Sequence, residues 1–564
     1  MDNKQYAVSD GPILNAYPDS MGGTLKEIVR FVQTDASGAF ATAYILPSLF
    51  NTDLDRGFSV IDYGLNKLYA AQDDLDALKA AGVSLKLDII LNHASVLSPQ
   101  FQDILKQGDA SPYRDFFIDW NRFWAGHGTL TTDGYIQPDE ADIKDMFFRK
   151  PGLPILMVRL PDGRNVPYWN TFYQEVRYPR MDAQDIMRAA DMQYASADRL
   201  AGMVNSALDA GQKPAEIDFG CWEAARPAVT EWLESNRKYL GQLDLNVQSE
   251  TVWAFYDHTL QTLAEYGAEI IRLDAFAYAP KTPGKRNFLN EPDTWELLDK
   301  VHTLAKRYQL TLLPEIHASY AEKTYEKLSS QGYMCYDFFL PGLILDALER
   351  YDGAYLAAWA QEQQAKGIRT VNMLGCHDGI PLLDLKGLLP EEYIEKLIET
   401  VVARGGMVKD LHGKKNVYYQ VNATYYSALG ANDKKLLLAR ALQLFMPGKP
   451  QIWYLDLFAG ENDLGAVAHG GPAAHKEINR TNMTDAQIAK AMERDIVKDQ
   501  LALLRLRNTC PAFGFDANLI IDQPDAHTLR LIWHKAGHTA ALTANLKTCA
   551  FDIMVNGKPF VWER

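Results

Sequence analysis

The 564-residue chain has little cysteine, no excess of positive charge and no long apolar run. Its five cysteines are scattered without a CxxC pair, which favours reduced thiols in a cytoplasm over a disulfide framework. A formal net charge of −15 argues against nucleic acid or an anionic membrane as the main partner. Because no run of eighteen apolar residues and no export-type N-terminus is visible, we expect a cytoplasmic protein without a membrane span.

Short apolar runs alternate with amphipathic stretches along most of the chain. In the amphipathic stretches apolar residues recur at three- and four-residue steps, as at Leu297, Val301 and Leu304, which is typical of helices. Strands are predicted at 12–17, 41–47, 85–91, 269–274, 310–316, 333–340, 369–375 and 450–455. Eight strands alternating with helices predict a (β/α)₈ TIM barrel, an α/β fold whose active site lies at the carboxyl ends of the strands.

Two interruptions and a tail divide the predicted barrel. We expect the barrel in residues 1–93, 241–378 and 431–516, an inserted domain at 94–240 after strand three, a smaller insertion at 379–430 after strand seven, and a C-terminal antiparallel β domain at 517–564. The last of these contains an Asn556-Gly557 step that is typical of a hairpin turn.

The inserted domain contains an extra, mostly helical segment at 175–241. Helices are predicted within it at 182–192, 196–210 and 222–238. The segment could cap the site, reshape the pocket for the acceptor or form a subunit interface. In the last case the protein could be a homodimer.

Three carboxylates follow three different predicted strands, namely Asp274, Glu315 and Asp378. A single aspartate at a strand end is typical of a cap or turn. Three that converge on one barrel mouth are better explained by glycosidic-bond chemistry, which needs one carboxylate to attack the anomeric carbon and another to protonate the departing oxygen.

Neighbouring residues suggest how these roles are divided. Arg272 lies on the same strand face as Asp274 and is expected to keep it ionised as a nucleophile. Glu315 follows the apolar run 312–314, which is expected to raise its pKa as a general acid and base. Asp378 is expected to stabilise positive charge in the transition state.

Four segments resemble the signature regions of glycoside hydrolase family 13, the α-amylase family, in their order and strand placement. They are DIILNH (88–93), IIRLDAFAY (270–278), LLPEIH (312–317) and GCHDG (375–379). Within that family the chain is most similar to the sucrose phosphorylases, through further segments such as DRGFSVIDY (55–63).

This resemblance implies a retaining mechanism on an α-glucoside, with the three carboxylates in the roles given above. Residues implied at the donor glucose are Asp55, Phe58, His93, Arg272, His377 and Arg480, and those implied at the adjoining site are Tyr278, His317, Tyr419 and Gln420. Arg149 or Lys150 falls where the group has a phosphate-binding basic residue. The implied partners are a small α-glucoside and phosphate, and we expect no metal and no cofactor beyond inorganic phosphate as co-substrate.

The leading function is therefore the phosphorolysis of sucrose to α-glucose 1-phosphate and fructose. Val417 stands where the group usually has an acidic residue on the side of the site that binds fructose. The second alternative is therefore a sister phosphorylase that acts on sucrose 6-phosphate, glucosylglycerol or glucosylglycerate. An α-glucosidase or transglucosidase is the third alternative, because the same carboxylates serve water or a sugar acceptor. A non-catalytic binding barrel is the fourth, and it would be expected to lack these carboxylates.

Overall fold

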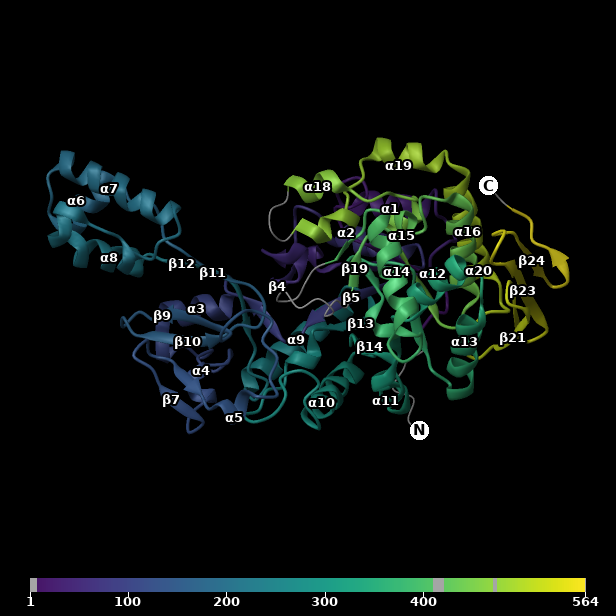
Figure 1. Ribbon diagram of the computed structural model, residues 1–564, viewed down its shortest axis with the longest axis horizontal. Coiled ribbons are helices and arrows are strands. Elements are labelled where there is room, and N and C mark those ends of the chain that lie inside the picture. The colour runs from purple at the N-terminus through teal and green to yellow at the C-terminus, as the bar shows by residue number, and fades with distance from the viewer. Residues whose placement is uncertain (1–7, 409–419, 470–473, 563–564) are drawn as a thin grey trace.

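Eight parallel strands form the centre of the computed structural model, which describes residues 8–408, 420–469 and 474–562 (Figure 1). The strands are β1 (Ile13–Ala16), β2 (Thr42–Ile45), β5 (Ser84–Ile90), β13 (Ala268–Asp274), β14 (Thr311–Pro314), β15 (Cys335–Asp337), β16 (Thr370–Met373) and β20 (Lys449–Trp453). Neighbours in the sheet follow chain order, and β14 lies beside β15 at the two ends of the ladder. All eight predicted strands are confirmed, and so is the barrel.

Helices cover the outside of the barrel because each has one apolar face. In α1 (Leu25–Gln33), Leu25, Ile28 and Phe31 are buried while the opposite face meets solvent. The other covering helices are α2 (Gln72–Ala80), α9 (Glu250–Glu265), α10 (Asp293–Arg307), α11 (Thr324–Ser330), α12 (Leu340–Arg350), α13 (Ala354–Lys366), α16 (Asp433–Phe445) and α20 (Asp495–Thr509). None of the helices in the described ranges has the length and apolarity to cross a membrane.

The long segment after β5 leaves and rejoins the barrel through one small sheet. There β6 (His93–Ser95) pairs antiparallel with β12 (Lys238–Asp244), which in turn pairs with β11 (Gln174–Arg177). Between them lie α3 (Pro99–Gln107), α4 (Trp120–Phe123), the pair β7 (Gly128–Leu130) and β8 (Ile136–Pro138), and the pair β9 (Ile155–Arg159) and β10 (Asn165–Trp169). Three buried tryptophans form a separate small core there: Trp120, Trp124 and Trp169.

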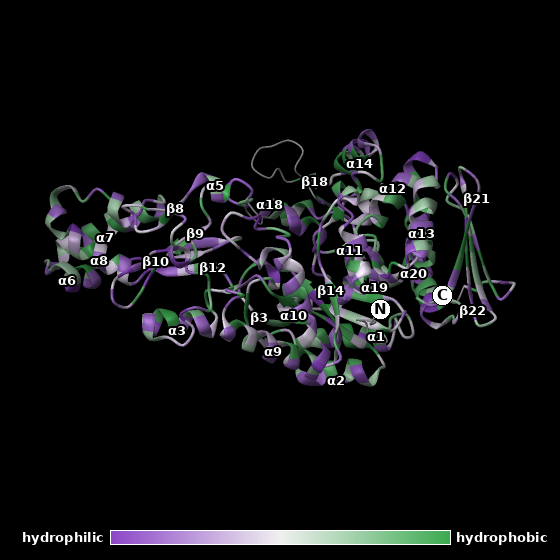
Figure 2. Cartoon of the chain, turned by 90° about the horizontal axis from the view of Figure 1, so that it is seen from below, coloured by the Kyte–Doolittle hydropathy of each residue, from purple (hydrophilic) through white to green (hydrophobic). Residues whose placement is uncertain are grey.

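A helical unit projects from the far end of this segment (Figure 1). It consists of α6 (Ala183–Ala190), α7 (Tyr194–Asp209) and α8 (Arg226–Ser235), which confirms the three helices expected there. Ile186, Leu200 and Val229 belong to a buried cluster that is separate from the barrel core. The unit therefore has its own hydrophobic core, at the opposite end of the molecule from the C-terminal sheet (Figure 2).

The C-terminal sheet packs on the barrel through alternate residues. It runs β21 (Asn518–Asp525), β22 (Thr528–Lys535), β23 (His538–Asn545), β24 (Phe551–Val555) and β25 (Lys558–Pro559), with the expected hairpin between the last two. In β22, Leu529, Leu531 and Trp533 are buried, and the indole of Trp533 donates to the carbonyl of Phe445 at 2.8 Å. The antiparallel pairing throughout this sheet agrees with the β domain expected in this part of the chain.

The shorter segment after β16 forms a second small sheet near the mouth of the barrel. Its strands are β17 (Ile380–Pro381), β18 (Met407–Val408) and β19 (Gln420–Asn422), and it is accompanied by α14 (Glu391–Ala403) and α15 (Tyr425–Ala428).

Candidate active site

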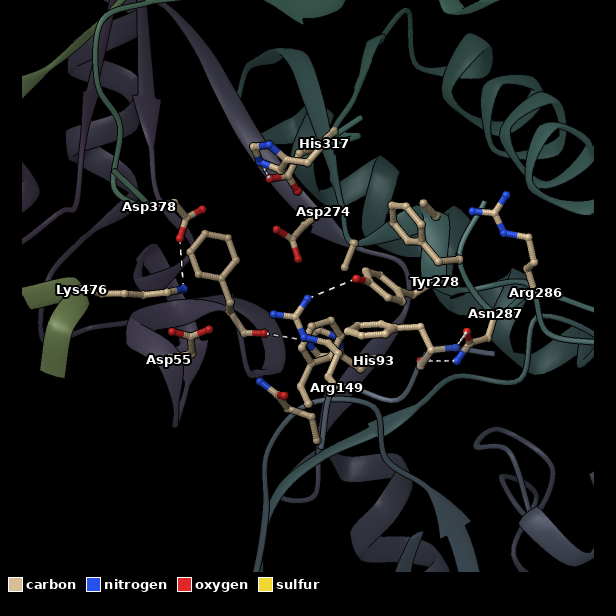
Figure 3. A pocket seen from close by; sticks show the side chains of 18 of the residues that line it. Asp55, His93, Arg149, Asp274, Tyr278, Arg286, Asn287, His317, Asp378 and Lys476 are labelled. Carbon is tan, nitrogen blue, oxygen red and sulfur yellow. Dashed lines mark hydrogen bonds and ion pairs between the residues drawn. The ribbon is translucent and has the colours of Figure 1, made fainter. Parts of the chain in front are cut away.

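A pocket of about 410 Å³ opens where the barrel strands end (Figure 3). Ten residues expected from the sequence line it: Asp55, Phe58, His93, Arg149, Asp274, Tyr278, Glu315, His317, His377 and Asp378. Arg272 and Arg480 are buried and contact these carboxylates. Tyr419 and Val417 lie outside the described residues.

Arg272 joins the two carboxylates that were expected to perform the chemistry. Its Nη1 lies 2.8 Å from Asp274, and its Nη2 lies 2.7 Å from Glu315. Nη1 also donates to Asp88 at 2.5 Å, and Asp88 accepts from the hydroxyl of Tyr44 at 3.1 Å. Because Arg272 is only 3% exposed, one buried guanidinium fixes the orientation of the carboxylates of Asp274 and Glu315.

The pKa values of this pair differ from the expectation. Burial and the negative charge of Glu315 raise the pKa of Asp274 well above its usual range, although Arg272 acts against them. For Glu315 burial is outweighed by Arg272 and His317, which lower its pKa to about 2. The prediction that apolar neighbours raise the pKa of Glu315 is therefore wrong, and at Asp274 burial and Glu315 outweigh Arg272, which was expected to keep this carboxyl ionised.

Asp378 is held by three basic side chains at one end of the pocket. His377 Nε2 donates to it at 3.0 Å, Lys476 Nζ lies 3.0 Å away, and Arg480 Nη2 lies 3.4 Å away. Burial opposes the charge of Asp378, but these neighbours keep its pKa well below the usual range. Asp378 is therefore a permanently ionised carboxylate facing the pocket.

Phe58 and His93 line the pocket beside Asp378. The Phe58 ring stacks on His377 with centroids 5.0 Å apart, and Arg272 lies over the same ring at 5.5 Å. His93 Nε2 donates to the carbonyl of Phe58 at 3.0 Å, and burial lowers the pKa of His93. Asp55 lies at the same end and is exposed (Figure 3). This end thus offers a flat apolar face edged by polar groups, which suits a sugar ring.

His317 lies between Glu315 and a second buried acid. Its Nε2 is 3.6 Å from Glu315 and its Nδ1 is 3.4 Å from Asp384, while its ring stacks on Phe338 with centroids 4.0 Å apart. The amide of Gln420 lies 3.2 Å from His317 Nε2. Burial opposes a charge on His317, but Asp384 and Glu315 raise its pKa to about 10, so the imidazole is a cation.

Arg149 and Lys150, which the sequence could not separate, occupy different places. Arg149 lines the pocket, donates to the hydroxyl of Tyr278 at 3.1 Å and lies 5.1 Å from the ring of Phe172. Lys150 is not among the lining residues; it donates to Asn170, and burial lowers its pKa to about 8. Of these two residues, only Arg149 is therefore placed to meet an anion in this pocket.

Several lining residues were not expected from the sequence. They are Asp145, Phe147, Phe172, Gln242, Ala275, Ala277, Arg286, Asn287, Phe288 and Lys476. Most come from loops with no strand or motif to mark them, so the sequence offered no signal for them. Within the described ranges no group of three or more His, Cys, Asp or Glu side chains is arranged to hold a metal ion.

Comparisons with known proteins agree with this geometry. The chain is 48% identical to a sucrose 6(F)-phosphate phosphorylase of Ilumatobacter coccineus, over 96% of this chain and 95% of that protein. The chain belongs to the sucrose phosphorylase group of glycoside hydrolase family 13. It is an enzyme of the phosphorylase type.

Two further members of the sucrose phosphorylase group are similar along almost their whole length. A sucrose phosphorylase of Streptococcus mutans is 30% identical over 98% of this chain and all of that protein. A solved structure of a sucrose 6F-phosphate phosphorylase from Thermoanaerobacter thermosaccharolyticum superposes with a TM-score of 0.80 at 30% identity, covering 99% of each chain. No family model matches the chain.

Proposed function

We propose that this phosphorylase cleaves sucrose 6F-phosphate with inorganic phosphate, giving α-glucose 1-phosphate and fructose 6-phosphate. The observation that supports it is the charge of the pocket beyond the carboxylates, where Arg149, His317 and Arg286 face the same cavity. A leaving group with a phosphate and an attacking phosphate are both anions, and an acidic protein needs local cations to bind them. The 48% identity to a relative named for that substrate supports the same choice.

The first half of the proposed reaction transfers the glucosyl group to Asp274. Its carboxylate oxygen attacks C1 of glucose, the bond from C1 to the bridging oxygen breaks, and Glu315 gives its proton to the fructose 6-phosphate that leaves. Glu315 must carry a proton when it acts as the acid, so substrate binding has to raise its pKa, which Arg272 and His317 hold low. Arg272 contacts both carboxylates and therefore holds them in place for their two roles.

The second half transfers the glucosyl group to phosphate. An oxygen of hydrogen phosphate attacks C1, the ester to Asp274 breaks, and the proton of the attacking hydroxyl passes to Glu315. Attack from the face that fructose left preserves the α configuration. Asp378, ionised by its three basic neighbours, stabilises the positive charge at C1 in both transition states.

Sucrose itself is the second candidate, as the resemblance found in the sequence suggests. The aromatic wall favours it, because Tyr278 packs against Phe288 at 4.7 Å and Phe172 at 5.7 Å, and such rings accept an uncharged sugar. Both candidates use the same carboxylates and differ only in the group that leaves.

The test is to incubate the enzyme with sucrose 6F-phosphate or sucrose, with and without inorganic phosphate, and to measure glucose 1-phosphate and free glucose. We expect phosphate-dependent glucose 1-phosphate, with a higher kcat/KM for sucrose 6F-phosphate. A higher kcat/KM for sucrose would replace the proposed substrate by the second candidate. Free glucose formed at the same rate without phosphate would contradict phosphorolysis altogether.

A further inference from the structure

Two loops form the wall of the pocket opposite Asp378, and one buried amide holds them together. The side chain of Asn287, 2% exposed, accepts from the backbone N–H of Phe147 at 2.8 Å and donates to the Phe147 carbonyl at 2.8 Å. This two-bond clamp fixes the loop that carries Arg149 against the loop that carries Arg286. Both arginines therefore have defined positions on one wall.

Arg286 has no carboxylate partner in the part of the chain that the structure describes, and its side chain is exposed at the pocket. The acid whose pKa it influences is Glu291, but Lys327 already lies 2.5 Å from that carboxylate. By contrast, the preceding Lys285 pairs with Asp293 at 3.3 Å and does not line the pocket.

Apart from Lys476, which pairs with Asp378, the cations that line the pocket lie in two separate places. His317 lies beside Glu315, and Arg149 is bonded to Tyr278 in the middle of the cavity. Arg286 and Asn287 lie at the end away from Asp378 and Lys476, with Tyr278 between (Figure 3). An attacking phosphate must reach C1 near Asp274 and Glu315. Of the cations named here, only Arg149 and His317 are therefore suited to bind it. Arg286, at the other end, is left for an anionic group that takes no part in the reaction.

We propose that Arg286 binds the phosphate on C6 of the departing fructose, while Arg149 and His317 receive the inorganic phosphate. This inference rests on the proposed function and assigns the two anions of that reaction to different residues. Arginine suits the binding of the C6 phosphate because its planar guanidinium donates two parallel hydrogen bonds to one phosphate.

The test compares the wild type with Arg286→Ala and, as the matched control, Lys285→Ala, which removes the same charge one residue away. The KM values for fructose 6-phosphate and fructose are measured in the synthetic direction with glucose 1-phosphate, and the KM for inorganic phosphate in phosphorolysis. We expect Arg286→Ala to raise the KM for fructose 6-phosphate about 10- to 100-fold, the effect of losing hydrogen bonds between charged groups. Its KM values for fructose and inorganic phosphate, and all three for Lys285→Ala, should stay within about twofold.

The outcomes separate this inference from the proposed function. If the wild type does not distinguish fructose 6-phosphate from fructose, the proposed function fails and the inference fails with it. If the wild type distinguishes them and Arg286→Ala does so equally well, only the role of Arg286 is overturned. An equal rise in the KM for fructose and fructose 6-phosphate would also overturn it, because that pattern indicates a distorted wall rather than a lost phosphate contact.

Discussion

The ammonium of Lys281 lies 2.8 Å from the carboxylate of Asp244, and each side chain is only 1% exposed. The same ammonium donates to the side-chain oxygen of Asn92 at 3.1 Å and to the backbone carbonyl of Tyr278 at 2.6 Å. Asn92 follows β5, Asp244 ends β12, and Tyr278 lines the pocket. One buried cation therefore ties the barrel, the inserted segment and the pocket wall together.

Replacing Lys281 by methionine should destabilise the protein by about 3–5 kcal/mol, since it leaves Asp244 buried without its partner. Urea unfolding measures the change. The double variant Lys281→Met with Asp244→Asn should recover part of the loss, because no unpaired charge then remains. A loss below about 1 kcal/mol for the single variant would show that the pair is not important for stability.

Replacing Glu315 by glutamine should slow phosphorolysis by about 10²- to 10⁴-fold, the usual contribution of a general acid. The loss should be much smaller with α-glucosyl fluoride, because fluoride leaves without a proton. Initial rates with both substrates make the comparison, and Asp274→Asn, which removes the nucleophile, should be inactive with both. Equal losses with the two substrates would contradict the acid role of Glu315.

Replacing Asp384 by asparagine should change how phosphate binding depends on pH. Asp384 is the largest cause that raises the pKa of His317 to about 10, so without it the imidazole should lose its proton at lower pH. The KM for phosphate should then rise with pH in the variant across a range where the wild type still carries the cation. Identical dependence of KM on pH in both proteins would show that the charge of His317 does not serve phosphate.

The same shift has a consequence for stability, measured as the free energy of unfolding against pH. Because the folded pKa of His317 is raised, its contribution is fully present below the unfolded value near 6.5 and is lost as pH rises through about 10. The wild type should therefore lose more stability than the Asp384→Asn variant over that range.

Replacing residues 178–237 by an Asn-Gly turn should leave a folded, active enzyme. Arg177 at the end of β11 pairs with Lys238 at the start of β12, so a two-residue turn closes these strands as a hairpin. The helical unit has its own core, and none of the pocket-lining residues belongs to it. Kinetics with sucrose 6F-phosphate and the mass in solution test this. Fewer subunits per particle than in the wild type, with activity retained, would identify the unit as a subunit interface, and a lost substrate preference would make it part of the acceptor site.

The barrel and its three carboxylates could be predicted because strand alternation is local. Arg272 and Asp274 are two residues apart on one strand, so the sequence alone places them together. That Arg272 also reaches Glu315 depends on how β13 lies against β14, and this contact reverses the expected pKa of Glu315. The contacts with Arg272, from the neighbouring strand, and with His317 therefore outweigh the burial of Glu315, which raises its pKa.

The wall of the pocket could not be predicted for a related reason. Arg286 and Asn287 lie in a loop and Lys476 lies in a short 3₁₀ helix, Ala474–Asn479, where neither periodicity nor spacing indicates the direction of a side chain. The register at Arg149 and Lys150 was ambiguous for the same cause. It was decided by two local contacts, the hydrogen bond from Arg149 to Tyr278 and that from Lys150 to Asn170.

The clamp between Asn287 and Phe147 also bears on how such enzymes diverge. Its two hydrogen bonds join loops from distant parts of the chain, so a change in the length of one loop breaks both bonds unless the other loop changes too. The carboxylates at the ends of β13 and β14 do not take part in the clamp. These two loops can therefore change jointly while the carboxylates expected to break the bond keep their places.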